Sequence, residues 1–232
     1  MANILVCDDD KDIVSAIEIY LLEDSHVVFK AYDGYQALDI LEKEDIQLVI
    51  LDIMMPELSG IEVAEKIREK SEVPIIFLSA KSEESDKVDG LNAGGDDYVT
   101  KPFSPAELTA RVRSNLRRYT QFGNSNDNNN NTHVYSAGAL CINDESKSVT
   151  VDGEPVKLTP IEYNILLLLL KNKGTVFSTD KIFQSIWNET PIATDNTVAV
   201  HIRHIREKIE INPGQPKFLK VVWGVGYKIE DI

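Results

Sequence analysis

The stretch Leu48-Val49-Ile50-Leu51-Asp52 decides the fold, because four apolar residues run directly into one carboxylate. Uninterrupted apolar runs of this length are typical of strands buried on both faces, and such strands belong to parallel sheets. Three further strand-like stretches also end in polar side chains: the apolar runs at residues 4–7 before Asp8-Asp9 and 74–78 before Ser79, and the more polar stretch at residues 97–100 before Lys101-Pro102. Since ligand sites of open parallel sheets lie at the carboxyl ends of strands, we expect the four endings to meet in one crevice.

The side chains at these endings suit metal-assisted phosphoryl transfer. A small hard cation such as Mg²⁺ prefers oxygen ligands, which makes Asp8 and Asp9 candidate ligands. Asp52 can act as a carboxylate nucleophile, while Lys101 neutralises charge on phosphoryl oxygens and Ser79 offers its hydroxyl to one of them. A Lys-Pro peptide can adopt the cis isomer, and that bend would aim Lys101 into the crevice.

Each of these residues alone has a simpler explanation. Aspartate pairs often cap helices, and Asp10 with Asp12 could cap the helix that follows the first run. A lysine among carboxylates can be only an ion pair, and a lone serine after a strand is usually a turn residue. Their joint occurrence at four strand ends favours a functional site.

Residues 1 to about 120 resemble a response-regulator receiver domain, through Asp8-Asp9, Asp52, Ser79, Tyr98 and Lys101-Pro102-Phe103. The resemblance implies a doubly wound α/β fold with a five-stranded parallel sheet, in which Asp52 takes phosphate from a sensor histidine kinase. It also implies that Asp9, Asp52 and the Met54 carbonyl bind Mg²⁺, with Asp8 helping through water. Ser79 and Tyr98 would be the switch pair, although core packing also explains Tyr98.

The same resemblance implies a symmetric receiver dimer once Asp52 is phosphorylated. Three complementary charge pairs stand where the OmpR/PhoB subfamily forms intersubunit salt bridges: Lys87 with Glu107, Asp97 with Arg111, and Asp96 with Arg118. The simpler alternative is a solvated helix, whose exposed ion pairs contribute only about 0 to 1 kcal/mol each. A two-fold axis uses every pair twice, which favours the interface.

The composition indicates a protein of two ordinary domains without a membrane span. The 232 residues can bury two cores, and no apolar stretch approaches the roughly 20 residues that cross a bilayer. The N-terminus enters a strand without a basic region or cleavage site, so we expect no secretory signal and a cytoplasmic location. Cys7 and Cys141 are then expected to be buried free thiols.

An asparagine-rich segment without apolar periodicity, residues 121–133, is the expected linker between a receiver at 1–120 and a second domain at 134–232. Residues 1–122 hold 13 Lys/Arg and 25 Asp/Glu, a formal net charge of −12, whereas residues 133–232 hold 11 and 12. The chain's net charge of −14 argues against indiscriminate binding to nucleic acid. Specific binding therefore needs a local basic face on the second domain.

The second domain begins with short strand-like stretches over residues 134–157, which predict a small antiparallel sheet with a hairpin at Asp152-Gly153. Thr159-Pro160-Ile161-Glu162 is a helix start, and this Leu-rich helix is expected to end near Lys171. Ser178 should cap a second helix, and Thr194 or Asp195 a third that runs to about Ile209. Residues 218–229 predict two strands joined by a glycine-containing turn.

The third helix can enter a major groove of DNA. Its apolar stripe, Val198, Ile202, Ile205 and Ile209, should face the core. The other sides carry Asn196, Val200, Arg203, His204 and Glu207, with His201, Arg206 and Lys208 on the flanks. Arginine can pair with guanine, asparagine with adenine and valine with a thymine methyl, while flanking cations hold phosphates. An ordinary amphipathic surface helix would show the same pattern.

Residues 134–232 resemble the OmpR/PhoB winged-helix effector domain, through residues 158–163, residues 196–203 and Gly224-Val225-Gly226-Tyr227. The resemblance implies binding to promoter DNA at tandem direct repeats, with residues 195–209 as the recognition helix and residues 188–193 as a loop that contacts RNA polymerase. Many members carry an arginine before the wing glycines, where this chain has Trp223. Lys220 or Lys228 would then supply phosphate contacts, and Trp223 would pack on sugar or brace the wing.

Residues 117–119, 200–204 and 222–228 further resemble the vancomycin-resistance regulators of the VanR type. That resemblance implies a VanS-like membrane kinase as phosphate donor and promoters of cell-wall precursor genes as targets. Two other functions stay open. One is a Mg²⁺-dependent phosphohydrolase with Asp8 as nucleophile, since Asp8 and Asp10 have the required spacing. The other is a DNA-binding regulator that does not respond to phosphate.

Overall fold

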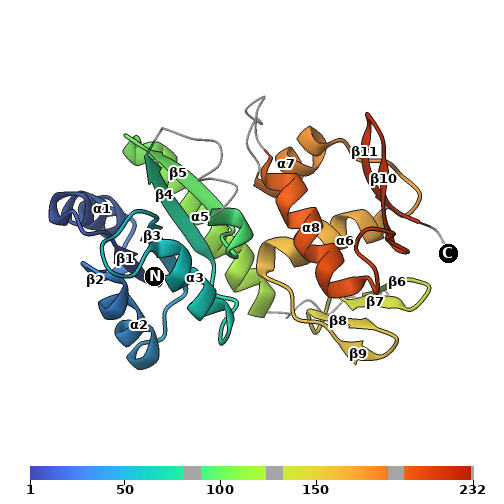
Figure 1. Cartoon of the computed structure of the whole chain (residues 1–232), viewed down its shortest axis with the longest axis horizontal. Helices are drawn as coiled ribbons and strands as arrows, with labels where there is room; N and C mark the ends of the chain where they lie inside the picture. Colours follow the sequence, from blue (N-terminus) through green and yellow to red (C-terminus); the bar gives the residue numbers. More distant parts are fainter. Residues whose placement is uncertain (81–89, 124–132, 188–195, 231–232) are drawn as a thin grey trace. The chain divides into compact units, whose positions relative to one another are not determined.

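The computed structural model describes residues 1–80, 90–123, 133–187 and 196–230. Its contacts divide the chain into two compact units, Met1–Tyr119 and Thr120–Ile232 (Figure 1). The predicted domain limits of 1–120 and 134–232 stay predictions. Helix α5, Pro105–Gly123, continues into the predicted linker, and residues 124–132 of that linker lie outside the described residues. Within the described ranges, no helix is long and apolar enough to cross a membrane.

The first unit is built on five parallel strands in the order β2-β1-β3-β4-β5, as expected from the apolar runs. The strands are β1 Asn3–Cys7, β2 Val27–Ala31, β3 Leu48–Asp52, β4 Ile75–Ala80 and β5 Asp97–Lys101. The helices between and after them are α1 Lys11–Glu23, α2 Gly34–Lys43, α3 Gly60–Arg68 and α5. Because the strand order reverses between β1 and β3, the carboxyl ends of these two strands border a crevice.

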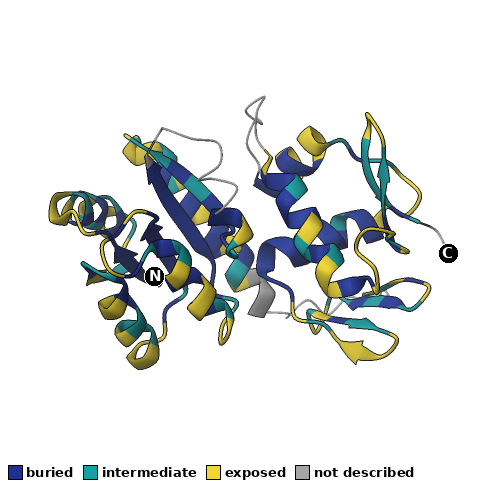
Figure 2. Ribbon diagram, viewed as in Figure 1, coloured by how far each residue is buried: buried dark blue, intermediate teal, exposed yellow. Residues whose placement is uncertain are grey.

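Helices cover both faces of this sheet, which explains the continuous apolar runs (Figure 2). Alternate strand residues such as Leu5, Val49 and Leu51 pack against α2 and α3, while Ile4, Leu48 and Ile50 pack against α1 and α5. All of these side chains are fully buried. The strand ends are thereby fixed on a rigid support.

Two local predictions are confirmed at the edge of the crevice. Asp10 caps α1, where its carboxylate accepts hydrogen bonds from the backbone N–H groups of Asp12 at 2.9 Å and Ile13 at 3.4 Å. Asp10 therefore has the structural role of a helix cap, and Asp12 lies in the first turn of α1. The Lys101-Pro102 peptide bond is cis.

The second unit combines a small sheet, three helices and a hairpin. An antiparallel sheet in the order β6-β7-β8-β9 opens it, with strands Val134–Ala137, Leu140–Asn143, Ser148–Val151 and Glu154–Pro155. Helices α6 Pro160–Lys171, α7 Thr179–Trp187 and α8 Thr197–Ile209 follow, and β10 Leu219–Val222 pairs with β11 Gly226–Ile229. This is the winged-helix arrangement that the sequence indicated.

The predicted starts of the first two helices are confirmed. Thr159 and Glu162 form a complete capping box at α6, and the Ser178 hydroxyl accepts from the N–H of Lys181 at 3.2 Å in α7. For α8 the capping residue is Asn196, whose side chain makes no cap hydrogen bond. Thr194 and Asp195, the predicted caps, lie outside the described residues, and the helix starts at 197 rather than 195.

Candidate functional sites

Three aspartates meet at the carboxyl edge of the first sheet. One carboxylate oxygen from each of Asp8, Asp9 and Asp52 lies within 4.8 Å of the others. Asp8 follows β1 and is fully buried, Asp52 ends β3 and is 4% exposed, and Asp9 is exposed. The topology thus brings together residues 44 positions apart, as the strand endings predicted.

Lys101 bridges the two buried carboxylates. Its Nζ lies 2.7 Å from Oδ2 of Asp8 and 2.5 Å from Oδ1 of Asp52. The other oxygen of Asp52 accepts from the backbone N–H of Met54 at 2.8 Å, and Asp8 accepts from the N–H of Asp10 at 3.0 Å. Lys101 can therefore neutralise charge at Asp52 without leaving its position at β5.

The charges in this group do not balance, since one ammonium faces three carboxylates. Burial raises the pKa of Asp52 above its usual value, and the hydrogen bond and charge of Lys101 offset part of that rise. Burial by itself lowers the pKa of Lys101, but the hydrogen bonds to Asp52 and Asp8 raise it overall. An all-oxygen set with excess negative charge fits a hard divalent cation such as Mg²⁺.

Ser79 and Tyr98 occupy the neighbouring strands β4 and β5. The Ser79 hydroxyl is 2% exposed, and its oxygen has no hydrogen-bond partner among the described residues. Such an orphan buried hydroxyl is unusual and suits a group that acquires a partner in another state. Tyr98 is half-buried at the edge of the core, with the Arg111 guanidinium 6.0 Å from its ring centre. The switch role of both residues stays a prediction.

Gly60 is a residue of this site that the sequence reasoning missed. A Cβ atom at this position would lie 2.0 Å from the carbonyl oxygen of Asp52, so any other residue would displace the end of β3. Ser59 and Glu62 form a capping box that fixes the start of α3 beside it. The Ser-x-x-Glu spacing over residues 59–62 is a signal that could have located this helix start.

The residues predicted to form intersubunit salt bridges have partners within the chain. Arg111 lies 2.8 Å from Asp97 and 3.8 Å from Glu107. Asp96 is 1% exposed and pairs with Arg68 at 2.7 Å, a residue that the sequence reasoning did not connect to it. Arg118 donates to the Ser114 hydroxyl at 2.8 Å. Lys87 lies outside the described residues, and the intersubunit pairing stays a prediction.

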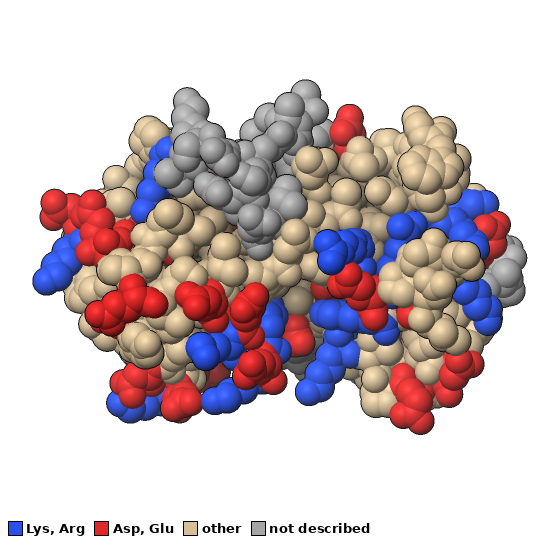
Figure 3. Space-filling view, viewed as in Figure 1, with Lys and Arg blue, Asp and Glu red and all other residues tan. Residues whose placement is uncertain are grey.

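Helix α8 places its apolar stripe as expected, with Val198, Ile202, Ile205 and Ile209 all buried in the core of the second unit. Arg203 is exposed and pairs with Glu207 at 2.8 Å. Asn196 is exposed at the start of the helix. Figure 3 shows Lys and Arg interspersed with acidic side chains over the region of α8, whereas acidic side chains dominate much of the first unit.

Three predicted DNA contacts on α8 lie differently from the expectation. His201 is 1% exposed and its ring centre lies 5.8 Å from that of Trp187, so it belongs to the core rather than to an open flank. Position 201 lies only about 60 degrees from the apolar stripe, which explains the difference. Val200 is 7% exposed, although helical spacing places it on the side opposite the apolar stripe. Arg206 donates to the Leu219 carbonyl at 3.0 Å and thereby ties α8 to β10.

A buried glutamate joins α8 to the start of α6. Glu162 is 2% exposed, and its carboxylate lies 2.7 Å from Nζ of Lys208 and 3.9 Å from Nδ1 of His204. Both partners are predicted DNA contacts. The sequence indicated only the capping role of Glu162, because nothing local in the chain connects residue 162 to residue 208.

The hairpin β10–β11 carries the remaining predicted DNA contacts. Trp223, at its tip, is 88% exposed. Lys220 and Lys228 face each other across the two strands. Lys228 also pairs with Glu230 at 2.9 Å, and Lys220 donates to the Pro216 carbonyl.

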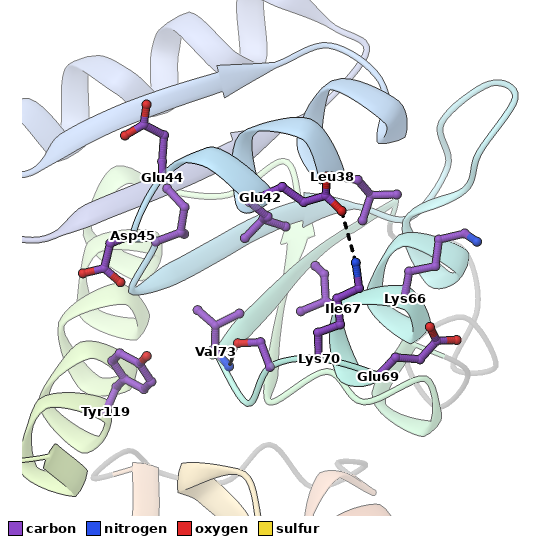
Figure 4. A pocket seen from close by; sticks show the side chains of 13 residues that line it. Leu38, Glu42, Glu44, Asp45, Lys66, Ile67, Glu69, Lys70, Val73 and Tyr119 are labelled. Atoms are coloured by element: carbon purple, nitrogen blue, oxygen red, sulfur yellow. Dashed lines mark hydrogen bonds and ion pairs between the residues drawn. The ribbon is translucent and has the colours of Figure 1, made fainter.

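A pocket of about 370 Å³ lies elsewhere on the first unit, between the C-terminal parts of α2 and α3 (Figure 4). Leu38, Leu41, Ile46, Ile67 and Val73 supply apolar walls, and Tyr119 stands at one end. Ile46 and Val73 precede β3 and β4, so the pocket borders the amino ends of the strands. It contains none of the predicted site residues.

Comparison with known proteins agrees with both units. The family model for the response regulator receiver domain matches residues 4–113, and the model for the C-terminal domain of transcriptional regulatory proteins matches residues 153–229. The fold and the acidic site therefore define a two-component response regulator with a DNA-binding domain. The chain belongs to the OmpR/PhoB family of such regulators.

Its similarity extends along the whole chain to regulators of the VanR type. It is 45% identical over 229 residues to the regulatory protein VanR of Enterococcus faecium, with 98% of each chain covered. It is 40% identical over 228 residues to VanRc of Enterococcus gallinarum, again with 98% of each covered. The solved structure of DrrB, an OmpR/PhoB homologue of Thermotoga maritima, is 33% identical with a TM-score of 0.51 over 99% of each chain.

Proposed function

We propose that Asp52 accepts a phosphoryl group from a sensor histidine kinase and that this modification switches the regulator on. The observation that carries the proposal is the group of three carboxylates within 4.8 Å, two of them bridged by Lys101, at the carboxyl ends of β1, β3 and β5. A carboxylate buried beside a fixed ammonium is suited to receive a group that brings its own negative charge.

The transfer is a substitution at phosphorus. One Asp52 oxygen forms a bond to phosphorus while the bond between phosphorus and the kinase histidine nitrogen breaks, which leaves an aspartyl phosphate and a neutral imidazole after proton uptake. Lys101 already contacts the reacting carboxylate and is placed to neutralise charge on the phosphoryl oxygens. The N–H of Met54 holds the other Asp52 oxygen and so orients the nucleophile.

Mg²⁺ is the proposed cofactor, with Asp8, Asp9, Asp52 and the Met54 carbonyl as candidate ligands. When bound, the ion would neutralise negative charge shared between Asp52 and the incoming phosphoryl group. The excess of two negative charges in this cluster supports the assignment. The exposed carboxylate of Asp9 leaves the cluster open to solvent on one side.

The orphan hydroxyl of Ser79 supports a switch step. In the proposal this hydroxyl donates to a phosphoryl oxygen on Asp52, and Tyr98 changes its packing beside it. The surface that contains Asp97, Glu107 and Arg111 then forms a symmetric dimer, in which the charges fix the register. Dimerisation brings two recognition helices to one DNA site and raises affinity through effective concentration.

The proposed target of α8 is promoter DNA with tandem direct repeats, and Asn196, Arg203 and His204 are candidate base contacts. Lys208, Lys220 and Lys228 are candidate phosphate contacts. Similarity to VanR supports a VanS-like kinase as donor and genes for vancomycin resistance or cell-wall synthesis as targets. A cytoplasmic location and contact between residues 188–193 and RNA polymerase belong to the same proposal, although that loop lies outside the described residues.

The family is one of transcriptional regulators rather than enzymes with external substrates. The phosphohydrolase alternative needs Asp8 as a free nucleophile. Asp8 is fully buried, and its two oxygens accept hydrogen bonds from Lys101 and from the N–H of Asp10. That environment does not favour the alternative.

Sedimentation with a phosphoryl mimic tests the proposal. Wild-type protein, Asp52→Ala and the matched control Asp39→Ala, an exposed aspartate on α2, are compared in Mg²⁺ with and without beryllofluoride. We expect wild type and Asp39→Ala to shift from monomer to dimer and Asp52→Ala to stay unchanged. Equal behaviour of all three proteins would contradict phosphate-gated dimerisation and support a regulator that does not respond to phosphate.

A further inference from the structure

The pocket between α2 and α3 lies at the opposite edge of the first sheet from the acidic cluster. Its volume of about 370 Å³ falls within the range of about 300 to 1,000 Å³ that is usual for small-molecule sites. Ile46, Ile67 and Val73 in its walls are buried in the core of the receiver, and Leu38 and Leu41 pack against the same core. Because the walls belong to the folded core, the pocket exists before any ligand binds.

The lining of the pocket carries an excess of negative charge. It combines four carboxylates with two ammonium groups, a net charge of −2: Glu42, Glu44, Asp45 and Glu69 against Lys66 and Lys70. Lys70 already pairs with Glu42 at 3.1 Å (Figure 4). In the part of the chain that the structure describes, no lysine or arginine pairs with Glu44 or Asp45. The uncompensated charge therefore lies at the end where α2 leads into β3.

The end of α2 adds to the negative potential there. The last carbonyl groups of a helix have no partner within the helix, so its C-terminus carries a partial negative charge. Lys43, in the last turn, is already paired with Asp39 at 2.6 Å. The side-chain amide of Gln47 donates to the Asp45 carboxylate at 3.0 Å and so fixes its position. A positively charged group at this end of the pocket is favoured by the carboxylate and the helix terminus together.

Tyr119 of α5 stands at the same end of the pocket as Asp45 (Figure 4). Burial raises the pKa of the Tyr119 phenol above its usual value, and the negative charge of Asp45 adds to that rise. The phenol is therefore neutral at pH 7. Its ring can attract a cation through the negative face of the aromatic system. Asp45 and Tyr119 thus offer a charge and a ring face to one cationic group.

Neither an anion nor a fully apolar molecule suits this lining. An anion would meet the net negative charge, and the ammonium group of Lys70 is engaged by Glu42. An apolar molecule would displace water from Asp45 without replacing its hydrogen bonds, which is unfavourable for a charged group. A ligand with an apolar body and a positive end satisfies both parts of the pocket.

We propose that this pocket binds a small organic cation, an amine with an alkyl or aryl body, whose ammonium group lies between Asp45 and Tyr119. Its body would contact the apolar walls. Both side chains of the Glu42–Lys70 pair are exposed, so this pair is weak and can open to admit the ligand. The inference does not rest on phosphoryl transfer at Asp52, because none of the predicted site residues lines the pocket.

Three probes with one shared body test the proposal. 3-Phenylpropylamine, 3-phenylpropan-1-ol and 3-phenylpropionate differ only in the charge and hydrogen bonding of the head group. Binding to the full chain is followed by NMR of isoleucine and valine methyl groups, with Ile46, Ile67 and Val73 as reporters inside the pocket. We expect the amine to bind about tenfold more tightly than the alcohol, and the carboxylate to cause no shifts. High salt should reduce the advantage of the amine.

Three variants identify the residues responsible. Asp45→Asn keeps an oxygen that accepts from Gln47 and loses the charge, so it should bind the amine about tenfold more weakly and no better than the alcohol. Tyr119→Leu removes the ring face and should weaken the amine more than the alcohol. Asp39→Asn removes one negative charge from the same helix outside the pocket and should behave as wild type.

Either of two results would overturn the inference: the alcohol binds as tightly as the amine, or Asp45→Asn leaves the affinity for the amine unchanged. Absence of methyl shifts with all three probes at millimolar concentration would also overturn it and would favour a protein segment as the occupant. Each measurement is made without Mg²⁺ or a phosphoryl mimic. A failure here is therefore distinct from a failure of the proposed switch at Asp52.

Discussion

Removing the Glu162 side chain should destabilise the second unit and leave the receiver intact. The carboxylate accepts from the buried N–H of Thr159 at 2.8 Å and pairs with Lys208 at 2.7 Å. Losing the acceptor leaves a buried donor unsatisfied, which costs about 1 to 3 kcal/mol. The Lys208 side chain is 33% exposed and regains water, so the lost pair adds at most about 1 kcal/mol. We therefore expect Glu162→Ala to lower the free energy of unfolding by about 1 to 4 kcal/mol.

The conservative variant separates the two contributions. Glu162→Gln keeps an oxygen that can accept from Thr159, and it loses only the charge that faces Lys208. Its cost should therefore stay near about 1 kcal/mol. A matched control is Glu207→Ala, which breaks an exposed pair with Arg203 and should cost less than about 0.5 kcal/mol.

Urea denaturation followed by tryptophan emission measures these costs in the full chain. Both tryptophans, Trp187 and Trp223, lie in the second unit, so the signal reports unfolding of that unit alone. Circular dichroism of the same samples reports the receiver as well. The structure predicts that losing the buried cap of Glu162 costs more than losing the exposed ion pair of Glu207. Equal costs for Glu162→Ala and Glu207→Ala would therefore refute the reasoning.

Three further changes have defined outcomes. Burial raises the pKa of Asp144, but hydrogen bonds from Lys147, Lys171 and Tyr163 lower it from 3.8 to about 2. Because the pKa of Asp144 is lower in the folded state than in the unfolded state, its ionised form stabilises the fold above about pH 4, and this stabilisation disappears as the pH falls through about 2. In urea titrations, Asp144→Asn should therefore lower the free energy of unfolding by about 2 kcal/mol at pH 7 and have no effect near pH 2. Gly60→Ala should cost the receiver more than about 2 kcal/mol in thermal unfolding and weaken Mg²⁺ binding, and unchanged values of both would contradict the close approach to Asp52. Arg68→Ala removes the guanidinium that lies 2.7 Å from the buried Asp96 carboxylate and should cost about 3 to 5 kcal/mol in urea, with much of the loss recovered by adding Asp96→Asn; no recovery would count against this pair.

The sequence allowed a correct prediction of the main sheet and of where its polar strand ends meet. Continuous apolar runs have a simple physical meaning, because only strands covered on both faces need them. The convergence of Asp8, Asp52 and Lys101 followed from the geometry of parallel strands and needed no knowledge of side-chain packing. The apolar stripe of α8 was predictable for the same reason, since it depends only on helical periodicity.

The partners of charged residues were not predictable in this way. Asp96 pairs with Arg68, 28 positions earlier, and Glu162 with Lys208, 46 positions later. Neither pair lies on one helix face or across one strand pair, so local periodicity carries no signal for it. Burial of His201 shows the same limit, because the neighbouring helix that supplies Trp187 decides which flank of α8 stays open.

The partners within the chain also bear on the proposed dimer. Asp97 and Arg111 are already paired at 2.8 Å, and both are largely buried. A dimer that uses the same side chains exchanges one ion pair for another, so the net electrostatic gain from these two residues is small. The free energy of dimerisation must then come from apolar contact, or from a rearrangement of this surface on phosphorylation. In the proposed mechanism the charge pairs would then decide which register forms, and the phosphoryl group on Asp52 would decide whether a dimer forms at all.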